Sequence, residues 1–158
     1  MAVYRGCEFP EDLLFDVERD VWVRRAADGL VTLGMTDPAQ ARCGKLVFVR
    51  MKAPGRQVER GKSLATIESA KWVGPLPAPL SGEIVETNAR GFQRDVLSAN
   101  KDPYGRGWLI RLRPTRLAEE LPDLLPAQQA AEVYRTKLDA LQLHCYRCVE
   151  GDEQDANR

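Results

Sequence analysis

Lys71 is the residue whose setting in the sequence best suits a chemical role. An alternating strand pattern begins at Thr66 and runs into this lysine, and Pro75, Pro77 and Pro79 follow shortly after it. Because proline lacks a backbone N–H, we expect no second regular element directly after Lys71, which places the lysine at a turn. A lysine held at the tip of a rigid hairpin, with its stem pointing to water, suits acylation of its amine after translation. The simpler alternative is that its charge only keeps the surface solvated.

Cys145 and Cys148 have the C-x-x-C spacing, which lets two thiols form a small disulfide loop or bind a metal ion. A zinc site needs two further ligands, and His144, the only histidine, cannot easily turn toward the same ion as its neighbour. We therefore expect no metal site and unreactive thiols, with a redox or sulfur-handling pair as the alternative. Cys7 lies in a segment expected to be mobile, from which its thiol can approach the C-terminal tail or a group attached to Lys71.

The sequence offers no set of catalytic side chains. A Ser-His-Asp triad cannot be assembled around a single histidine in any evident way, and no glycine-rich phosphate loop is present. Gly55, Gly61, Gly74 and Gly82 are better explained as turn residues. We therefore expect a protein that is not an enzyme by itself.

Length and composition favour one domain with an appendage. The chain has 158 residues, of which 44% are hydrophobic, enough to bury a core without a metal or disulfide framework. No apolar run has the length of a membrane span, and residues 1–8 lack the apolar stretch of a signal peptide. Four cysteines are too few and too unevenly spread for a secreted disulfide framework, so we expect a cytoplasmic protein.

The formal net charge of zero hides a segregation of charge along the chain. Six acidic residues stand against one basic residue in 8–20, whereas seven basic residues stand against Glu59 alone in 42–62. The basic segment lacks the interleaved aromatic residues of a nucleic-acid surface and forms no helical stripe. We interpret it as a solvated face or as a surface that attracts an acidic partner protein.

Short strands separated by turn residues predict a mainly β fold. Residues 21–24 and 30–34 alternate on either side of Asp28-Gly29, which is typical of a hairpin. A short helix is expected at 37–43, with Thr36 or Asp37 as its cap and Gly44 at its end. Further strands are expected at 45–51, before Lys71, at 83–88 and around 108–112. This pattern favours a small antiparallel sandwich or flattened barrel.

Four segments are expected along the chain. Residues 1–20 form a short irregular lead-in, and 21–121 form the main domain. Within 122–145 a helix starts near Pro126, runs to about His144 and packs one apolar face on the sheets. Binding of a partner by this helix is the alternative. Residues 146–158 form an acidic tail that we expect to be disordered.

Three separated motifs, at 68–71, 79–88 and 100–109, together resemble the H protein of the glycine cleavage system. The resemblance covers about two thirds of the chain, roughly Leu14 to Pro114. It implies a barrel-sandwich hybrid fold and lipoic acid attached as an amide to Lys71. It also implies that Glu68, three residues before that lysine, helps the lipoylating enzyme to recognise the turn. A biotin carrier is the nearest competitor, but its lysine usually lies between two methionines, and here Ala70 and Trp72 flank it.

Some positions depart from the glycine-cleavage pattern. That family usually continues its lysine motif with small and acidic residues and has His-Glu-Trp in its first strand, whereas this chain has Trp72-Val73-Gly74-Pro75 and Asp20-Val21-Trp22. The residues at 6–12, 68–75 and 102–105 look like the H-like lipoate-binding proteins of the heterodisulfide-reductase-like sulfur oxidation system of bacteria and archaea. This resemblance implies a carrier of sulfur intermediates whose partners are that complex, a sulfur transferase and a lipoylating enzyme.

Two other interpretations stay open at this stage. One is a glycine cleavage H protein that carries the aminomethyl intermediate. The other is an interaction protein that keeps the fold and is never modified. Changes around the lysine alter chiefly which partners bind, because the chemistry belongs to the attached group.

Overall fold

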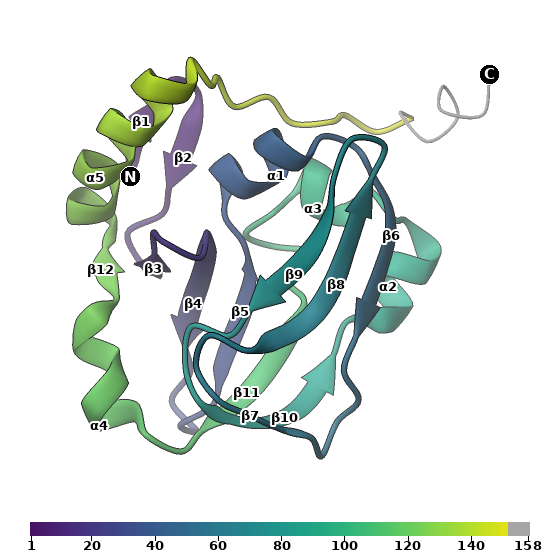
Figure 1. Cartoon of the computed structure of the whole chain (residues 1–158), viewed down its shortest axis with the longest axis vertical. Helices are drawn as coiled ribbons and strands as arrows, with labels where there is room; N and C mark the ends of the chain where they lie inside the picture. The colour runs from purple at the N-terminus through teal and green to yellow at the C-terminus, as the bar shows by residue number, and fades with distance from the viewer. Residues whose placement is uncertain (152–158) are drawn as a thin grey trace.

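The computed structural model describes residues 1–151, and within them the chain forms three sheets with short helices at their edges (Figure 1). The strands are β1 (Ala2–Tyr4), β2 (Cys7–Phe9), β3 (Leu14–Asp16), β4 (Val21–Arg25), β5 (Val31–Met35), β6 (Leu46–Met51), β7 (Gln57–Val58), β8 (Ser63–Ser69), β9 (Val73–Pro77), β10 (Gly82–Thr87), β11 (Ile110–Pro114) and β12 (Leu125–Pro126). The helices are α1 (Asp37–Cys43), α2 (Ala89–Arg94), α3 (Ser98–Lys101), α4 (Leu117–Glu120), the 3-10 helix η1 (Leu121–Asp123) and α5 (Ala127–Leu141).

The main apolar core lies between the two larger sheets. The seven-stranded sheet has the order β12-β3-β4-β5-β11-β10-β7, and the three-stranded sheet has the order β6-β8-β9. Side chains from both sheets join one buried cluster, which includes Leu33, Leu46, Ile67, Ile84 and Leu112, none more than 2% exposed. Each such side chain contributes about 1.5–3 kcal/mol by leaving water. The mainly β prediction is confirmed.

A second core lies under α5, which packs against β1, β2, β3 and β12. It is rich in aromatic side chains: the rings of Phe9 and Tyr134 stack with centroids 5.2 Å apart, and Phe15 meets Phe9 edge to face. Trp22 is fully buried, and its indole N–H donates a hydrogen bond to the Pro103 carbonyl at 2.9 Å. This core ties the N-terminal strands and α5 to one end of the sheet that carries β4.

The hairpin and the short helix expected from the sequence are both present. Strands β4 and β5 pair antiparallel around the turn at Asp28-Gly29. At α1 the Thr36 hydroxyl accepts a hydrogen bond from the Ala39 N–H at 3.2 Å, and Gly44 ends the helix with φ of +77°. The capping signals are local, which explains why the sequence located them.

The prediction that no regular element follows Lys71 directly is wrong. Strand β9 begins at Val73 and pairs with β8, with Pro75 opposite Thr66 and Pro77 opposite Ser63. The prolines are tolerated because β9 lies at the edge of its sheet, where an N–H that faces away from the neighbouring strand is not needed. The turn at Lys71 is therefore the tip of a regular hairpin.

Two predictions about the ends of the chain also need correction. Residues 1–20 are not irregular, because they form β1, β2 and β3, and β3 joins the seven-stranded sheet. The last helix ends at Leu141 rather than near His144, because Gln142 adopts a left-handed conformation with φ of +51°. Leu141, the last residue of the helix, is 48% exposed.

After α5 the chain crosses back over the α1 end of the molecule (Figure 1). The Cys145 N–H donates to the Arg5 carbonyl at 2.9 Å, and the Arg147 guanidinium pairs with Asp37 at 3.0 Å. The beginning of the expected disordered tail is therefore bonded to the domain, whereas 152–158 lie outside the described residues. No helix in the part that the structure describes is long and apolar enough to cross a membrane.

Gly34 and Trp22 give a test of this packing. A Cβ at Gly34 would lie 2.6 Å from three atoms of the Trp22 indole, and the buried ring has little room to move. We expect Gly34→Ala to lower the free energy of unfolding by about 1–3 kcal/mol, measured by urea denaturation. In a Trp22→Phe background, which removes the overlapping indole atoms, the same change should cost clearly less. An equal cost in both backgrounds would rule out this steric explanation.

Candidate functional site

Lys71 lies at the tip of the β8–β9 hairpin. Glu68 pairs with Val73 as the last rung of the ladder, and the Ser69 N–H donates to the Trp72 carbonyl at 2.8 Å to close the turn. The Ser69 hydroxyl also accepts the Lys71 N–H at 3.4 Å. The Lys71 side chain is exposed. The prediction of an exposed turn lysine is therefore confirmed.

The stem of Lys71 rests against the end of α1. A Cβ placed on Gly44 would lie 2.9 Å from Lys71 Cε, so the absence of a side chain at this position leaves room for the lysine stem. The positive φ of Gly44 requires glycine for the helix end as well. Gly44 thus ends α1 and also leaves space for the Lys71 side chain to pack against the backbone.

Asn100 holds this contact in place. Its side-chain oxygen accepts the Leu46 N–H at 2.9 Å, and its side-chain amide donates to the Gly44 carbonyl at 2.7 Å. Asn100 is 1% exposed. Asn100 belongs to the motif at 100–109, but the sequence alone assigns it no role. A single asparagine gives no indication in the sequence of which distant segments its side chain will bond. The helix-stop signal at Gly44 was visible, but its contact with Lys71 was not.

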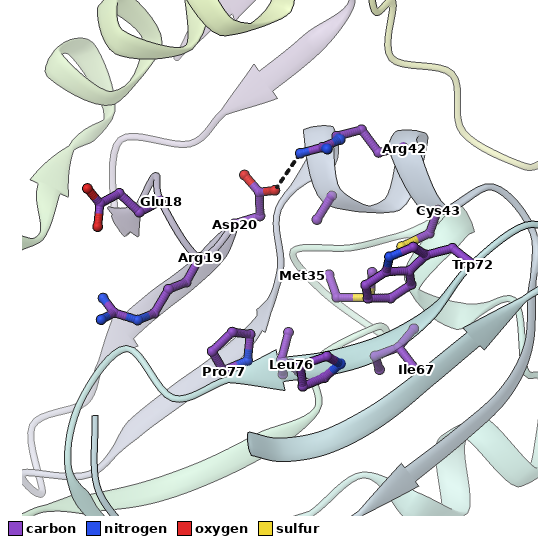
Figure 2. Close-up of a pocket in the computed structure, with 12 residues that line it drawn as sticks. Glu18, Arg19, Asp20, Met35, Arg42, Cys43, Ile67, Trp72, Leu76 and Pro77 are labelled. Carbon is purple, nitrogen blue, oxygen red and sulfur yellow. Dashed lines mark hydrogen bonds and ion pairs between the residues drawn. The ribbon is translucent and has the colours of Figure 1, made fainter. Parts of the chain in front are cut away.

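A cleft of about 370 Å³ opens beside the hairpin (Figure 2). Its end near the hairpin is lined by Met35, Cys43, Ile67, Trp72 and Leu76. Figure 2 shows Glu18 and Arg19 at the other end and Asp20 between the two ends, beside Arg42. Trp72 is 41% exposed and lines the end near the hairpin together with Cys43 and Met35 (Figure 2). The part of the cleft next to Lys71 is therefore apolar and contains two sulfur atoms.

The carboxylate of Asp20 lies in the cleft wall but is already fully engaged. One oxygen accepts hydrogen bonds from the Tyr134 hydroxyl at 2.7 Å and the Lys137 amine at 3.1 Å, and the other pairs with Arg42 at 3.5 Å. Glu18 lies at the opposite end of the cleft from Trp72 (Figure 2). No carboxylate in the described residues of this cleft is therefore both unpaired and close to the hairpin.

Cys43 closes the bottom of the apolar end. Its side chain is 7% exposed, and burial raises the pKa of the thiol from 9.0 to about 11, with a smaller contribution from the negative charge of Asp20. The positive charges of Arg42 and Lys71 act in the opposite direction but do not prevail. The thiol is therefore neutral at physiological pH. Sequence reasoning placed Cys43 in the helix without assigning it a role.

Glu68 lies on the outer face of the hairpin, away from the cleft side to which Ile67 belongs. In the sheet its cross-strand neighbours are Phe48 and Val73, and its side chain is half-buried. The structure thus places Glu68 and Lys71 on one hairpin. A recognition role for this carboxylate stays a prediction.

The cysteines pair differently from the expectation. Cys7 and Cys145 form a disulfide with Cα atoms 4.8 Å apart, so the expectation that Cys145 is an unreactive thiol is wrong, and the C-x-x-C pair is not closed on itself. The expected approach of Cys7 to the C-terminal segment does occur. Cys43 and Cys148 are outside this disulfide. Among the described residues no cluster of side chains could hold a metal ion, and the disulfide belongs to the α5 core rather than to the lysine hairpin.

Comparison with known proteins identifies the family. The model of the glycine cleavage H-protein family matches residues 13–137. Glycine cleavage system H protein 2 of Aquifex aeolicus is 43% identical over 142 residues, which are 90% of this chain and 88% of that protein. Probable glycine cleavage system H protein 2 of Sulfurisphaera tokodaii is 42% identical over 149 residues, 93% of this chain and 99% of that protein.

A solved structure agrees with the sequence match. The crystal structure of a glycine cleavage system H protein from Mycobacterium marinum has a TM-score of 0.70 and 36% identity, and the match covers 79% of this chain and 98% of that one. The expected barrel-sandwich hybrid fold is thereby confirmed. The chain belongs to the glycine cleavage H-protein family, whose members are non-catalytic carriers with lipoate attached covalently to a lysine.

Proposed function

We propose that Lys71 is the lysine that carries lipoate in this protein. The observation that supports this most directly is its exposure at the tip of a closed hairpin, with the stem held against Gly44. A group attached through an amide to Nζ would begin beside the apolar end of the cleft, whose Trp72, Met35 and Leu76 side chains suit an uncharged ring. The residues present therefore fit this group.

The protein chain positions the lipoyl group and shelters what it carries, and the attached group supplies the chemistry. When bound, lipoate provides a disulfide that opens on reduction and accepts a group on sulfur. The hairpin keeps the attachment point in solvent, where partner enzymes reach it. The cleft excludes water from whatever is carried, because its nearest walls are apolar.

The first candidate cargo is the aminomethyl group of glycine cleavage. The relatives with 40–44% identity over about nine tenths of the chain are named glycine cleavage system H proteins, which favours this role over the sulfur role. The partners would then be the glycine cleavage enzymes and a lipoylating enzyme. An aminomethyl group is basic, however, and this cleft offers it no unpaired carboxylate near the hairpin.

The second candidate cargo is sulfur, passed from a sulfur transferase to a heterodisulfide-reductase-like complex. The specific observation that favours it is the cleft lining, where Met35 and a neutral Cys43 give an apolar, polarizable environment instead of a charged one. In addition, Aquifex aeolicus has relatives named H protein 2, 3 and 5, so one organism holds several such carriers. Several carriers need not share one cargo.

Intact mass under non-reducing conditions, followed by peptide mapping, tests the attachment and the cargo together. The protein is taken from its own host, grown with and without a reduced sulfur compound. We expect a lipoyl group on Lys71 and an unmodified mass for Lys71→Arg, with Lys62→Arg, another exposed lysine, as the matched control.

The same measurement distinguishes the two cargoes. Extra sulfur on the lipoyl group only in sulfur-fed cells would support the sulfur role. Its absence, together with transfer of the aminomethyl group from glycine decarboxylase, would support glycine cleavage. Unmodified Lys71 in the native protein would rule out both the sulfur role and the glycine cleavage role.

Lipoylation kinetics test the role of Glu68. Because this carboxylate has no ion-pair partner among the described residues and lies three residues from the hairpin tip, we expect Glu68→Gln to slow lipoylation of Lys71. Loss of one charge-assisted hydrogen bond to the lipoylating enzyme corresponds to about a tenfold decrease in kcat/KM. Glu59→Gln, at another exposed carboxylate, is the control and should leave the rate unchanged. Equal rates for both variants would remove the role.

Alkylation of Cys43 tests the chemistry of the cleft. A pKa of about 11 instead of 9.0 leaves roughly a hundredfold less thiolate at pH 8, so we expect iodoacetamide to label Cys43 in native protein at least that much more slowly than in urea. The native rate should rise about tenfold per pH unit until pH approaches 11. Equal rates in native and unfolded protein at pH 8 would show that this thiol is not sheltered.

A further inference from the structure

A second concave surface lies on the other side of the three-stranded sheet, between β6 and α2. This groove of about 330 Å³ is lined mainly by apolar side chains, among them Val47, Phe48, Met51, Phe92 and Val96. Val47 is 55% exposed and Phe48 is 49% exposed. Two large neighbouring apolar side chains on the surface are characteristic of an interaction site, whereas isolated ones are not.

The exposure of both residues has a backbone cause. The pairing of β6 with β8 shifts register between Leu46 and Phe48, so the alternation of inward and outward side chains is interrupted there. Val47 and Phe48 consequently both reach solvent, although neighbouring residues of a regular strand face opposite sides. Strand β6 is also an edge strand, which leaves this side of the sheet accessible.

Basic residues occur on or near both elements that form the groove. Lys52 lines it, Lys45 directly precedes β6, Arg50 lies on β6, Arg56 directly precedes β7, and Arg90 and Arg94 lie on α2. Within the described residues, 1–151, none of these six side chains forms an ion pair, whereas most arginines elsewhere on the surface have carboxylate partners. The charge around the groove is therefore free to attract an acidic partner.

The groove is also close to the lysine. Phe48 pairs with Glu68, which precedes Lys71 by three residues, and Leu46 follows the Gly44 against which the Lys71 stem rests. At about 3.3 Å per residue, the groove begins about 10 Å from the hairpin tip. A protein bound there would have Lys71 within its reach.

We propose that this groove binds an acidic amphipathic segment of an enzyme that loads or unloads the group on Lys71, which rests on the carrier role proposed above. Apolar side chains of the segment fill the space next to Phe48 and Phe92, and its carboxylates pair with the six basic side chains. A second copy of this chain is a poor occupant, because it would bring the same six positive charges. A nucleic acid is a poor one too, since Phe48 is the one exposed ring at the groove and provides no stacking platform.

Photo-crosslinking in the protein's own host tests the occupant. Position 48 carries p-benzoylphenylalanine in place of Phe48, and the control carries it in place of Val133, which is 49% exposed on α5. We expect an adduct from position 48 and not from position 133. Mass spectrometry should assign the attached peptide to a net acidic segment with apolar residues, in an enzyme that uses the lipoylated protein as substrate. No adduct at 48, or one with a basic peptide, with nucleic acid or with a second copy, would overturn the proposal.

Charge reversal tests the contribution of the basic side chains. We expect Arg90→Glu with Arg94→Glu to raise the KM of the crosslinked enzyme for the carrier at least tenfold, with kcat within twofold, because binding is weakened and the lipoyl group is unchanged. The matched control is Arg25→Glu with Lys62→Glu, two exposed basic residues outside the groove, which gives the same net charge. Equal KM values for the two double variants would refute the proposal.

Lys71→Arg separates this proposal from the carrier role. The variant cannot be lipoylated, but its groove is intact, so the adduct at position 48 should persist. If native protein has a bare Lys71, the carrier role fails, whereas the adduct still reports what the groove binds. If Lys71 is lipoylated but position 48 gives no adduct, only the groove proposal fails.

Discussion

The buried amide of Asn100 is the contact on which the arrangement around Lys71 depends. It joins the end of α1 to the start of β6, and its own carbonyl accepts the Cys148 N–H at 3.0 Å, which adds the C-terminal segment. A buried polar group that loses its partners costs about 1–3 kcal/mol, so the need to satisfy the Asn100 side chain holds the end of α1 and the start of β6 together, whereas its backbone carbonyl holds the C-terminal segment. Gly44 is fixed by this contact, and Gly44 in turn receives the lysine stem.

Much of the site could be predicted because its signals are local. The capping of α1 by Thr36, its end at Gly44 and the turn at Lys71 each depend on a few consecutive residues. The contacts that complete the site could not be predicted in this way. Asn100 meets Gly44 across 56 residues, and Cys7 meets Cys145 across 138, and no periodicity or spacing in the sequence specifies either pair.

The expectations of no strand at β9 and of a regular β6 were wrong for the same reason: the place of a strand within its sheet is not visible in the sequence. The prolines after Lys71 exclude a central strand but not an edge strand, and only the assembled sheet makes β9 an edge. For β6 the sequence predicted a strand at 45–51, whose side chains would alternate if it were regular, whereas the register shift exposes Val47 and Phe48 together. In both cases the sequence correctly identified the strand pattern or the prolines that disfavour a strand. Pairing with the neighbouring strands then determined whether β9 forms and which β6 side chains are exposed.

The hairpin that carries Lys71 has two faces with different surroundings. Ile67 and Leu76 point into the cleft and are almost fully buried, whereas Glu68 and Val73 belong to the outer face that adjoins Phe48. Because successive residues of a strand face opposite sides, a substitution on one face leaves the other largely unchanged. The apolar cleft and the groove beside β6 can therefore diverge independently around Lys71. In the roles that we propose for them, the cleft would adapt to the carried group and the groove to the partner enzyme, while the attachment point stays the same.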